Sequence, residues 1–122
     1  MKAGIAVAVA LVGLMESGAA MADGIDLLAD CSEAIRFQET RVSRDPSASS
    51  YCNGQVIGVM NTMYLLDEFL PKDMKTCFPP KLVNKQAVRI VVKHLQDNPT
   101  ILHLPSSHLI LGALHGAYPC KK

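Results

Sequence analysis

Four cysteines constrain what this chain can fold into more than any other feature. They are Cys31, Cys52, Cys77 and Cys120 in a chain of 122 residues, at spacings of 21, 25 and 43 residues. Zinc sites use much closer pairs, such as two cysteines separated by two residues, so these spacings argue against a metal centre. In an exported chain, an even number of cysteines predicts two disulfides, because compartments outside the cytoplasm are oxidising.

The N-terminus predicts export. Lys2 supplies a positive charge, and residues 3–15 form an unbroken run of apolar and small residues. Ala20-Met21-Ala22 then shows the small-x-small pattern that signal peptidase recognises, which places the cut before Asp23. The apolar run is shorter than the roughly 20 residues that a transmembrane helix needs. We therefore expect a cleavable signal peptide over residues 1–22, a location in the periplasm and no membrane anchor.

The remaining residues, 23–122, have the size of one ordinary domain with a modest core. The chain carries 12 Lys and Arg against 11 Asp and Glu, which gives a formal net charge of +1. This balance gives no reason to expect nucleic acid or an anionic membrane as a partner.

Helical spacing dominates the pattern of apolar residues. Stretches with apolar residues three and four apart cover about 24–38, 52–69, 84–96 and 106–117, and residues 100–104 could add one more turn. No alternating strand pattern of useful length is present, so the predicted fold class is all-α, a compact domain of four to five helices with two disulfides. The second stretch is apolar nearly all round, which is typical of the buried centre of a bundle, with its methionines in the core.

Local signals suggest where these helices begin. Asn84 is a candidate N-cap for the third helix. Pro105 fits the first turn of the fourth helix. The segment 43–50 contains Pro46 and four serines, so it is predicted to be a polar, mobile loop.

Two pairs of glycines stand four residues apart within predicted helices. Gly54 and Gly58 lie in the second helix, and Gly112 and Gly116 lie in the fourth. Each glycine inside a helix costs about 0.5–1 kcal/mol relative to alanine, which close approach of two backbones could offset. We therefore expect the second and fourth helices to cross tightly at these glycines.

Geometry favours one of the three possible disulfide pairings. Cys52 begins the second predicted helix and Cys77 lies beyond its end, so about 17 helical residues would separate them by about 25 Å. Bridged Cα atoms lie within about 7 Å, which excludes Cys52–Cys77 and with it Cys31–Cys120. Short connectors make neighbouring helices antiparallel and bring the start of the third near the end of the fourth. The expected bridges are Cys31–Cys52 and Cys77–Cys120.

The sequence shows no catalytic set. An enzyme would need a nucleophile with a base, a pair of carboxylates or a metal site. The motifs H-E-x-x-H and G-x-S-x-G are absent, as is a phosphate-binding glycine loop. His108 and His115 share a helix face, but metal-binding pairs on one helix usually stand four residues apart. We therefore expect a protein that is not an enzyme and that needs no cofactor.

Several short motifs are distributed along the predicted domain. They are Leu27-Leu28-Ala29-Asp30-Cys31, Tyr51 to Gly58, Cys77-Phe78-Pro79, Val91 to Leu95 with Asn98-Pro99, and Ala113-Leu114 through Tyr118-Pro119-Cys120. With this set the chain resembles the Rap/Tai family of immunity proteins, which protect bacteria against peptidoglycan amidases delivered by type VI secretion. The resemblance covers nearly all of residues 23–120.

The resemblance implies an exported helical domain, often a homodimer, that binds an amidase toxin and blocks its active-site groove. Family members commonly do this with a protruding loop whose sequence varies with the toxin. The first candidate loop is 98–107 and the second is 44–50. Within the first loop, the expected partner-binding residues are Asn98, His103, Leu104, Ser106 and Ser107.

Two other hypotheses belong to different classes of function. One is a periplasmic stress holdase or assembly factor without a dedicated toxin, in which the four histidines would gain charge at low pH. The other is a small hydrolase, for which the sequence offers no matching site.

Overall fold

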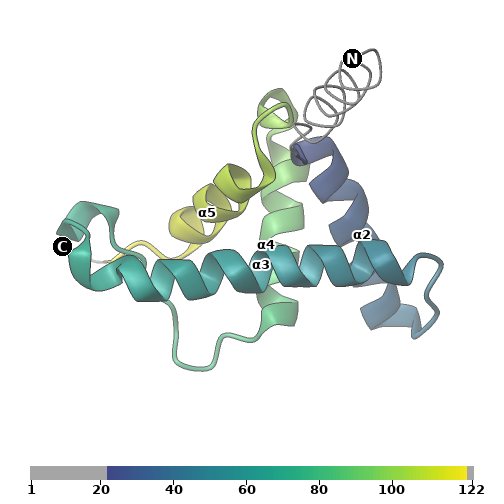
Figure 1. The fold of residues 1–122 in the computed structure, drawn as a ribbon, viewed down its shortest axis with the longest axis horizontal. Coiled ribbons are helices and arrows are strands. Elements are labelled where there is room, and N and C mark those ends of the chain that lie inside the picture. The colour runs from purple at the N-terminus through teal and green to yellow at the C-terminus, as the bar shows by residue number, and fades with distance from the viewer. Residues whose placement is uncertain (1–21, 121–122) are drawn as a thin grey trace, which may run out of the picture.

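The computed structural model describes residues 22–120, and these form an all-helical domain (Figure 1). The four α-helices are α2 (Gly24–Thr40), α3 (Pro46–Leu66), α4 (Asn84–Asp97) and α5 (Ser106–Ala117). Three single-turn 3-10 helices lie between them, η1 (Asp67–Phe69), η2 (Lys72–Met74) and η3 (Pro99–Ile101). No strand occurs within residues 22–120, which confirms the all-α fold class. Apart from Ala22, the predicted signal peptide lies outside the described residues.

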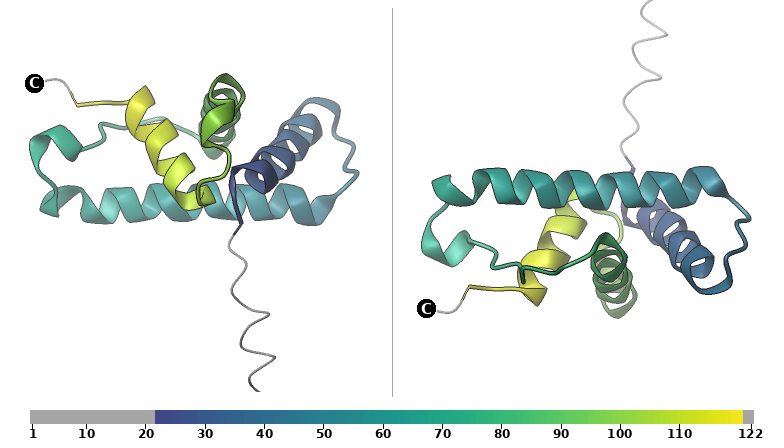
Figure 2. Two further views of the ribbon diagram at one scale, coloured as in Figure 1. Left: turned by 90° about the horizontal axis from the view of Figure 1, so that it is seen from above. Right: turned by 90° about the horizontal axis from the view of Figure 1, so that it is seen from below.

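The long helix α3 forms one side of the domain. Figure 2 shows α2, α4 and α5 packed together on the other side, so that the core lies between α3 and these three helices. Each helix contributes a stripe of buried side chains at helical spacing, which is the arrangement that burial of one helix face produces. The largest fully buried side chains are Leu27, Cys31, Cys52, Val56, Val88, Val91, Leu95, Ile110 and Leu114.

The prediction that the apolar second helix is buried on all sides is wrong. The buried residues of α3 form one stripe, Ser49, Cys52, Val56, Met60 and Met63, so its methionines do lie in the core as predicted. The other side of the helix faces solvent, because its three neighbours all pack on one side of it. Large apolar side chains therefore remain exposed on α3, notably Ile57, Tyr64, Leu65 and Leu66.

The beginning of α3 also differs from the prediction. The helix begins at Pro46 rather than Cys52, so most of the predicted loop 43–50 is helical. The Asp45 side chain caps this helix by accepting a hydrogen bond from the backbone N–H of Ala48 at 3.0 Å. Pro46 fits the first turn because its missing N–H would have no partner there. The same kind of cap begins α2, where Asp23 accepts from the backbone N–H groups of Ile25 and Asp26.

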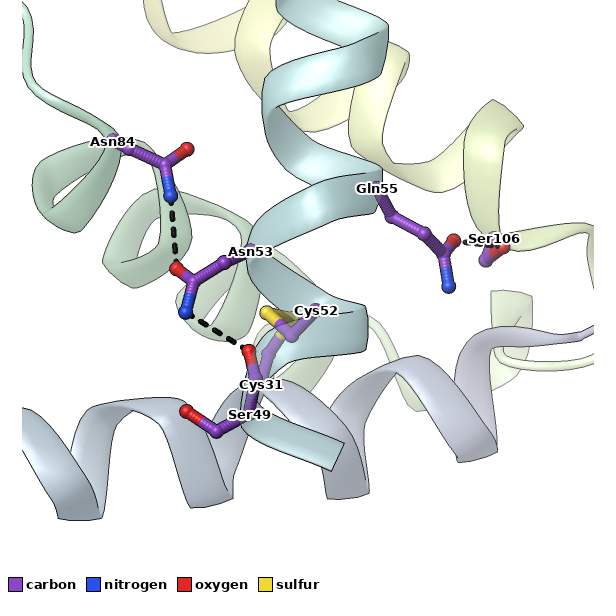
Figure 3. The surroundings of a disulfide bond; sticks show 7 residues. All are labelled: Cys31, Ser49, Cys52, Asn53, Gln55, Asn84 and Ser106. Carbon is purple, nitrogen blue, oxygen red and sulfur yellow. Dashed lines mark hydrogen bonds between the residues drawn. A yellow bond between two sulfur atoms is a disulfide. The ribbon is translucent and has the colours of Figure 1, made fainter. Parts of the chain in front are cut away.

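Asn84 does not cap α4, contrary to the prediction. The N-cap residue is Val83, and Asn84 is the first residue of the helix. Its side-chain NH₂ donates instead to the Asn53 side-chain oxygen at 2.8 Å, and Asn53 donates in turn to the backbone carbonyl of Ser49 at 2.9 Å (Figure 3). This chain of hydrogen bonds joins the start of α4 to α3. The Asn84 side chain therefore bonds to Asn53 on α3 and does not cap the backbone of its own helix.

Both predicted disulfides are confirmed. Cys31–Cys52 joins α2 to α3 with a Cα–Cα distance of 5.1 Å. Cys77–Cys120 joins the segment before α4 to the residues after α5, with a Cα–Cα distance of 4.9 Å.

The prediction that four glycines bring two helices together is wrong. A Cβ atom placed on Gly54, Gly58, Gly112 or Gly116 would meet no atom within 4 Å. The close approach occurs at Gly24, where a Cβ would lie 2.5 Å from Leu109 Cδ1 and 2.7 Å from the carbonyl oxygen of Leu102. These contacts pack the start of α2 against the segment that leads into α5.

Candidate functional site

The predicted partner-binding loop, 98–107, connects α4 to α5 and lies beside the start of α2 (Figure 1). The backbone N–H of Gly24 donates to the carbonyls of Leu102 and Leu104, at 2.8 and 3.1 Å. The N–H of Ser106 donates to the carbonyl of Ala22 at 3.1 Å. These bonds hold the second half of the loop, residues 102–106, against the start of α2.

Three of the five predicted contact residues have exposed side chains. These are Asn98, His103 and Ser107. Leu104 is half-buried and packs against the core. Ser106 is only 7% exposed, and its hydroxyl donates a 2.6 Å hydrogen bond to the side-chain oxygen of Gln55 (Figure 3). Ser106 is therefore part of the contact between α5 and α3, and its side chain is closed to a partner.

The second candidate loop, 44–50, is reduced to a short connector before α3. Glu33 on α2 holds this connector by accepting hydrogen bonds from the backbone N–H groups of Arg44 and Asp45, at 2.9 and 3.3 Å. Glu33 also accepts from the Arg36 guanidinium. The bond from Arg36, followed by the one from Arg44, lowers the pKa of Glu33 from 4.5 to about 2. Ser49 is buried, so this segment offers a partner fewer side chains than the sequence suggested.

An apolar groove lies along α5 and was not predicted from the sequence. Its volume is about 520 Å³, and its walls come from the second half of α3, from residues 67–76 and from α5. The lining residues are Gly58, Val59, Thr62, Met63, Leu66, Leu70, Met74, Thr76, Ser107, His108, Leu111 and His115. Ser107 belongs to both the predicted loop and the groove, so the two surfaces adjoin. One signal in the sequence could have indicated it: the stretch 52–69 has more apolar residues than one buried stripe of a helix requires.

The end of α3 and the following helix η1 carry the two most exposed large apolar side chains of the described chain. Leu65 is 71% exposed and Phe69 is 78% exposed, with Leu66 and Met74 close by in the sequence and also exposed. We call these four residues the α3-end patch. Apolar side chains gathered at one place on a surface are typical of sites that bind other proteins.

The described residues provide no obvious catalytic centre. Within residues 22–120, no group of three or more His, Cys, Asp or Glu side chains is placed to hold a metal ion. His108 and His115 both line the groove, where His115 Nδ1 lies 3.0 Å from the Thr76 hydroxyl. In the same part of the chain, no helix combines the length and the apolar character needed to cross a membrane.

Comparison with protein families identifies the family of the chain. Residues 23–120 match the family described as Rap1a immunity proteins. The chain belongs to the Rap1a immunity protein family. The match covers every described residue from the cap of α2 to Cys120, and it confirms the resemblance that the motifs indicated. No curated protein and no solved structure matches the chain.

Membership in the Rap1a family supports a role as an immunity protein, which acts by binding a protein toxin. It therefore implies a protein partner and suggests an inhibitor that carries out no catalysis of its own. The exposed surfaces of the described chain that are open to a protein partner include the loop 98–107, the groove beside it and the α3-end patch.

Proposed function

We propose that this protein is exported to the periplasm, where it binds a peptidoglycan amidase toxin delivered by type VI secretion and occludes the active-site groove of that toxin. The match of residues 23–120 to the Rap1a immunity proteins carries the proposal. In this account residues 1–22 are a cleaved signal peptide and residues 23–122 are the mature domain. The protein inhibits by steric exclusion of substrate and needs no cofactor.

The loop 98–107 is the proposed contact surface for the toxin. Its exposed side chains, Asn98, His103 and Ser107, stand on a backbone that Gly24 of the mature chain holds by hydrogen bonds to the carbonyls of Leu102 and Leu104. Hydrogen bonds within the loop, from Leu104 N to Ile101 O at 3.0 Å and from Ile101 N to Asn98 O at 3.2 Å, add to this rigidity. A preorganised loop loses little conformational freedom on binding, which favours affinity.

Protection of cells tests the function. A candidate amidase sent to the periplasm should lyse cells, and co-production of this protein with its leader should prevent lysis. The same protein without residues 1–22 should give no protection, because it would remain in the cytoplasm. The proposal would be refuted if the exported protein prevented lysis by none of the amidases that the same cell secretes.

Enzyme kinetics with purified toxin test the mechanism. Occlusion of the active-site groove predicts inhibition that rising concentrations of a peptidoglycan fragment relieve. Inhibition that substrate does not relieve would contradict steric blocking of the groove.

A pair of variants tests the contact surface. His103→Glu places a charge on the proposed contact loop and should weaken toxin binding at least about tenfold, as loss of one interface anchor does. Lys85→Glu makes a comparable change at an exposed position at the start of α4, far from the loop in Figure 1, and should leave affinity unchanged. Equal affinities of the two variants would place the contact elsewhere.

The family resemblance also implies a homodimer, and we assign its interface to the α3-end patch. Leu65 and Phe69 there are the most exposed large apolar side chains of the described chain. Light scattering of the purified protein should give twice the mass of the chain, and Leu65→Asp should give the mass of one chain. A monomer at every concentration would remove this part of the proposal.

One observation favours the alternative of a periplasmic stress holdase. The domain carries an exposed apolar groove, which could hold apolar segments of unfolded proteins, and His108 and His115 are among the residues that line it. Suppression of aggregation of unfolded proteins at about pH 5, and not at pH 8, would support this function. Absence of suppression at both values would exclude it.

A further inference from the structure

The structure assigns different roles to the two disulfides. Cys31–Cys52 is a permanent cross-link of the core. We propose that Cys77–Cys120 is a redox-sensitive latch, whose reduction by a dithiol frees residues 67–83 from α5 and opens the apolar groove. The latch acts within this chain and requires no toxin.

The two disulfides differ sharply in access to solvent. Cys31 and Cys52 are both 0% exposed and lie among the core side chains. Cys77 is exposed and Cys120 is half-buried. Disulfide reduction requires a thiolate to reach a sulfur atom, so a reductant can reach the Cys77–Cys120 sulfurs in the folded protein. It can reach Cys31–Cys52 only after the core opens.

Residues 67–83, which we call the strap, are weakly packed. None of them is buried, although Phe78 and Leu82 pack against the core, and their regular structure consists of the two single-turn helices η1 and η2 and one isolated β-bridge between Thr76 and Pro119. Segments with few buried apolar contacts open at the low end of a protein's range of local stabilities. The strap is therefore the segment whose position depends most on its cross-link.

The strap contacts α3 and the core through Phe78, whose ring lies 4.9 Å from the ring of Tyr64, and through Leu82, and its contacts with the end of α5 are few. The backbone N–H of Cys77 donates to the carbonyl of Tyr118 at 2.8 Å, and the Thr76 hydroxyl lies 3.0 Å from His115 Nδ1. The ring of Phe78 lies 6.0 Å from the ring of Tyr118, centre to centre. Cutting the disulfide leaves these few, partly exposed contacts to hold the strap against the end of α5.

The Cys77–Cys120 disulfide affects the groove because the strap that it holds forms one wall of the groove. Leu70, Met74 and Thr76 line the groove from the strap side, opposite Leu111 and His115 of α5. None of the fully buried core side chains comes from the strap. Release of the strap should therefore open the groove while the core and the helices remain in place.

The reduction step is an ordinary thiol–disulfide exchange. A thiolate of the dithiol attacks one sulfur of Cys77–Cys120, which forms a mixed disulfide and leaves the other cysteine as a thiolate that takes up a proton. The second thiol of the dithiol then closes its own disulfide and releases the first cysteine. Two electrons and two protons pass to the protein, and the dithiol becomes a cyclic disulfide.

Stepwise reduction tests the assignment. The oxidised protein is treated with increasing dithiothreitol without denaturant, alkylated and mapped by mass spectrometry. Cys77 and Cys120 should be labelled at least about tenfold faster than Cys31 and Cys52, because reduction of the buried pair must wait for opening of the core. Labelling of all four cysteines at one rate, or of the buried pair first, would overturn the proposal.

A matched pair of double variants tests the structural consequence. Cys77→Ser with Cys120→Ser should keep the helical circular dichroism of the wild type, while amide exchange rises in the strap and an apolar fluorescent dye binds more strongly. Cys31→Ser with Cys52→Ser, the control, should lose helical signal or cooperative unfolding. A latch variant that fails to fold, or one whose strap exchanges at the wild-type rate, would show that the bond is not a latch.

Discussion

The Ser106 hydroxyl donates a 2.6 Å hydrogen bond to the side-chain oxygen of Gln55, which joins the first turn of α5 to α3 (Figure 3). Ser106→Ala would leave that part-buried oxygen without its donor, so we expect the free energy of unfolding to fall by about 1–2 kcal/mol. Urea unfolding measures the change. The neighbouring Ser107 is exposed, so Ser107→Ala should shift stability by less than about 0.5 kcal/mol. Equal losses in the two variants would contradict the assigned role of Ser106.

Glycine substitutions should have opposite effects at the two kinds of glycine position. Gly24→Ala would place a Cβ 2.7 Å from the backbone oxygen of Leu102, so the start of α2 must move and stability should fall by about 1–3 kcal/mol. Gly54→Ala meets open space in the middle of α3 and should raise the free energy of unfolding by about 0.5–1 kcal/mol. Thermal unfolding of both variants checks the signs. A stabilised Gly24→Ala protein would refute the close approach.

The hydrogen bonds of Glu33 predict a loss of stability in acid. The pKa of this carboxyl is about 2 in the folded protein against 4.5 ordinarily, so ionised Glu33 stabilises the fold above about pH 4.5. This contribution should disappear as the pH falls from 4.5 towards 2. We expect Glu33→Gln to be less stable than the wild type at pH 7, with a difference that shrinks through this range. A difference that stays constant from pH 7 to pH 2 would show that ionised Glu33 is not the cause.

Arg41 is the one non-glycine residue with positive φ in the described chain, at φ 61°. It ends α2 in the left-handed conformation, and its N–H donates to the carbonyl of Phe37 at 2.9 Å. Glycine adopts this conformation without the Cβ penalty, so Arg41→Gly should raise the free energy of unfolding by up to about 1 kcal/mol. Arg44→Gly, at a position with negative φ, should lower it by a similar amount because the unfolded chain gains freedom. Denaturant unfolding of the two variants would distinguish these signs.

The sequence predicted the helices well where one face alone is apolar. The predictions 84–96 and 106–117 agree closely with α4 and α5, because buried positions such as Val88, Val91 and Leu95 impose the helical period. The stretch 52–69 misled because its apolar residues surround the helix and do not mark the buried side. Its true start could have been found, since Asp45 followed by Pro46 is a helix N-terminus signal.

The disulfide pairing was predictable because helix length excludes one of the three possibilities, and the antiparallel order of neighbouring helices favours Cys77–Cys120 among the other two. The contacts between helices were not. The open space beside Gly54 and Gly112 and the burial of Ser106 could not be predicted from the sequence, because each depends on which residues of another helix lie opposite. The groove escaped prediction for the same reason, since its walls come from three separate segments. Partner-binding residues follow from exposure, which only the assembled fold determines.

The hydrogen bond from the Ser106 amide to the carbonyl of Ala22 crosses the proposed point of scission. Cleavage before Asp23 would carry this acceptor away with the leader and leave a charged ammonium group in its place. The cap of α2 would survive, because the Asp23 carboxylate that accepts from Ile25 and Asp26 stays with the mature chain. Precursor and mature protein would thus share one fold and differ at the first turn of α5, where the amide resonance of Ser106 would report whether processing has taken place.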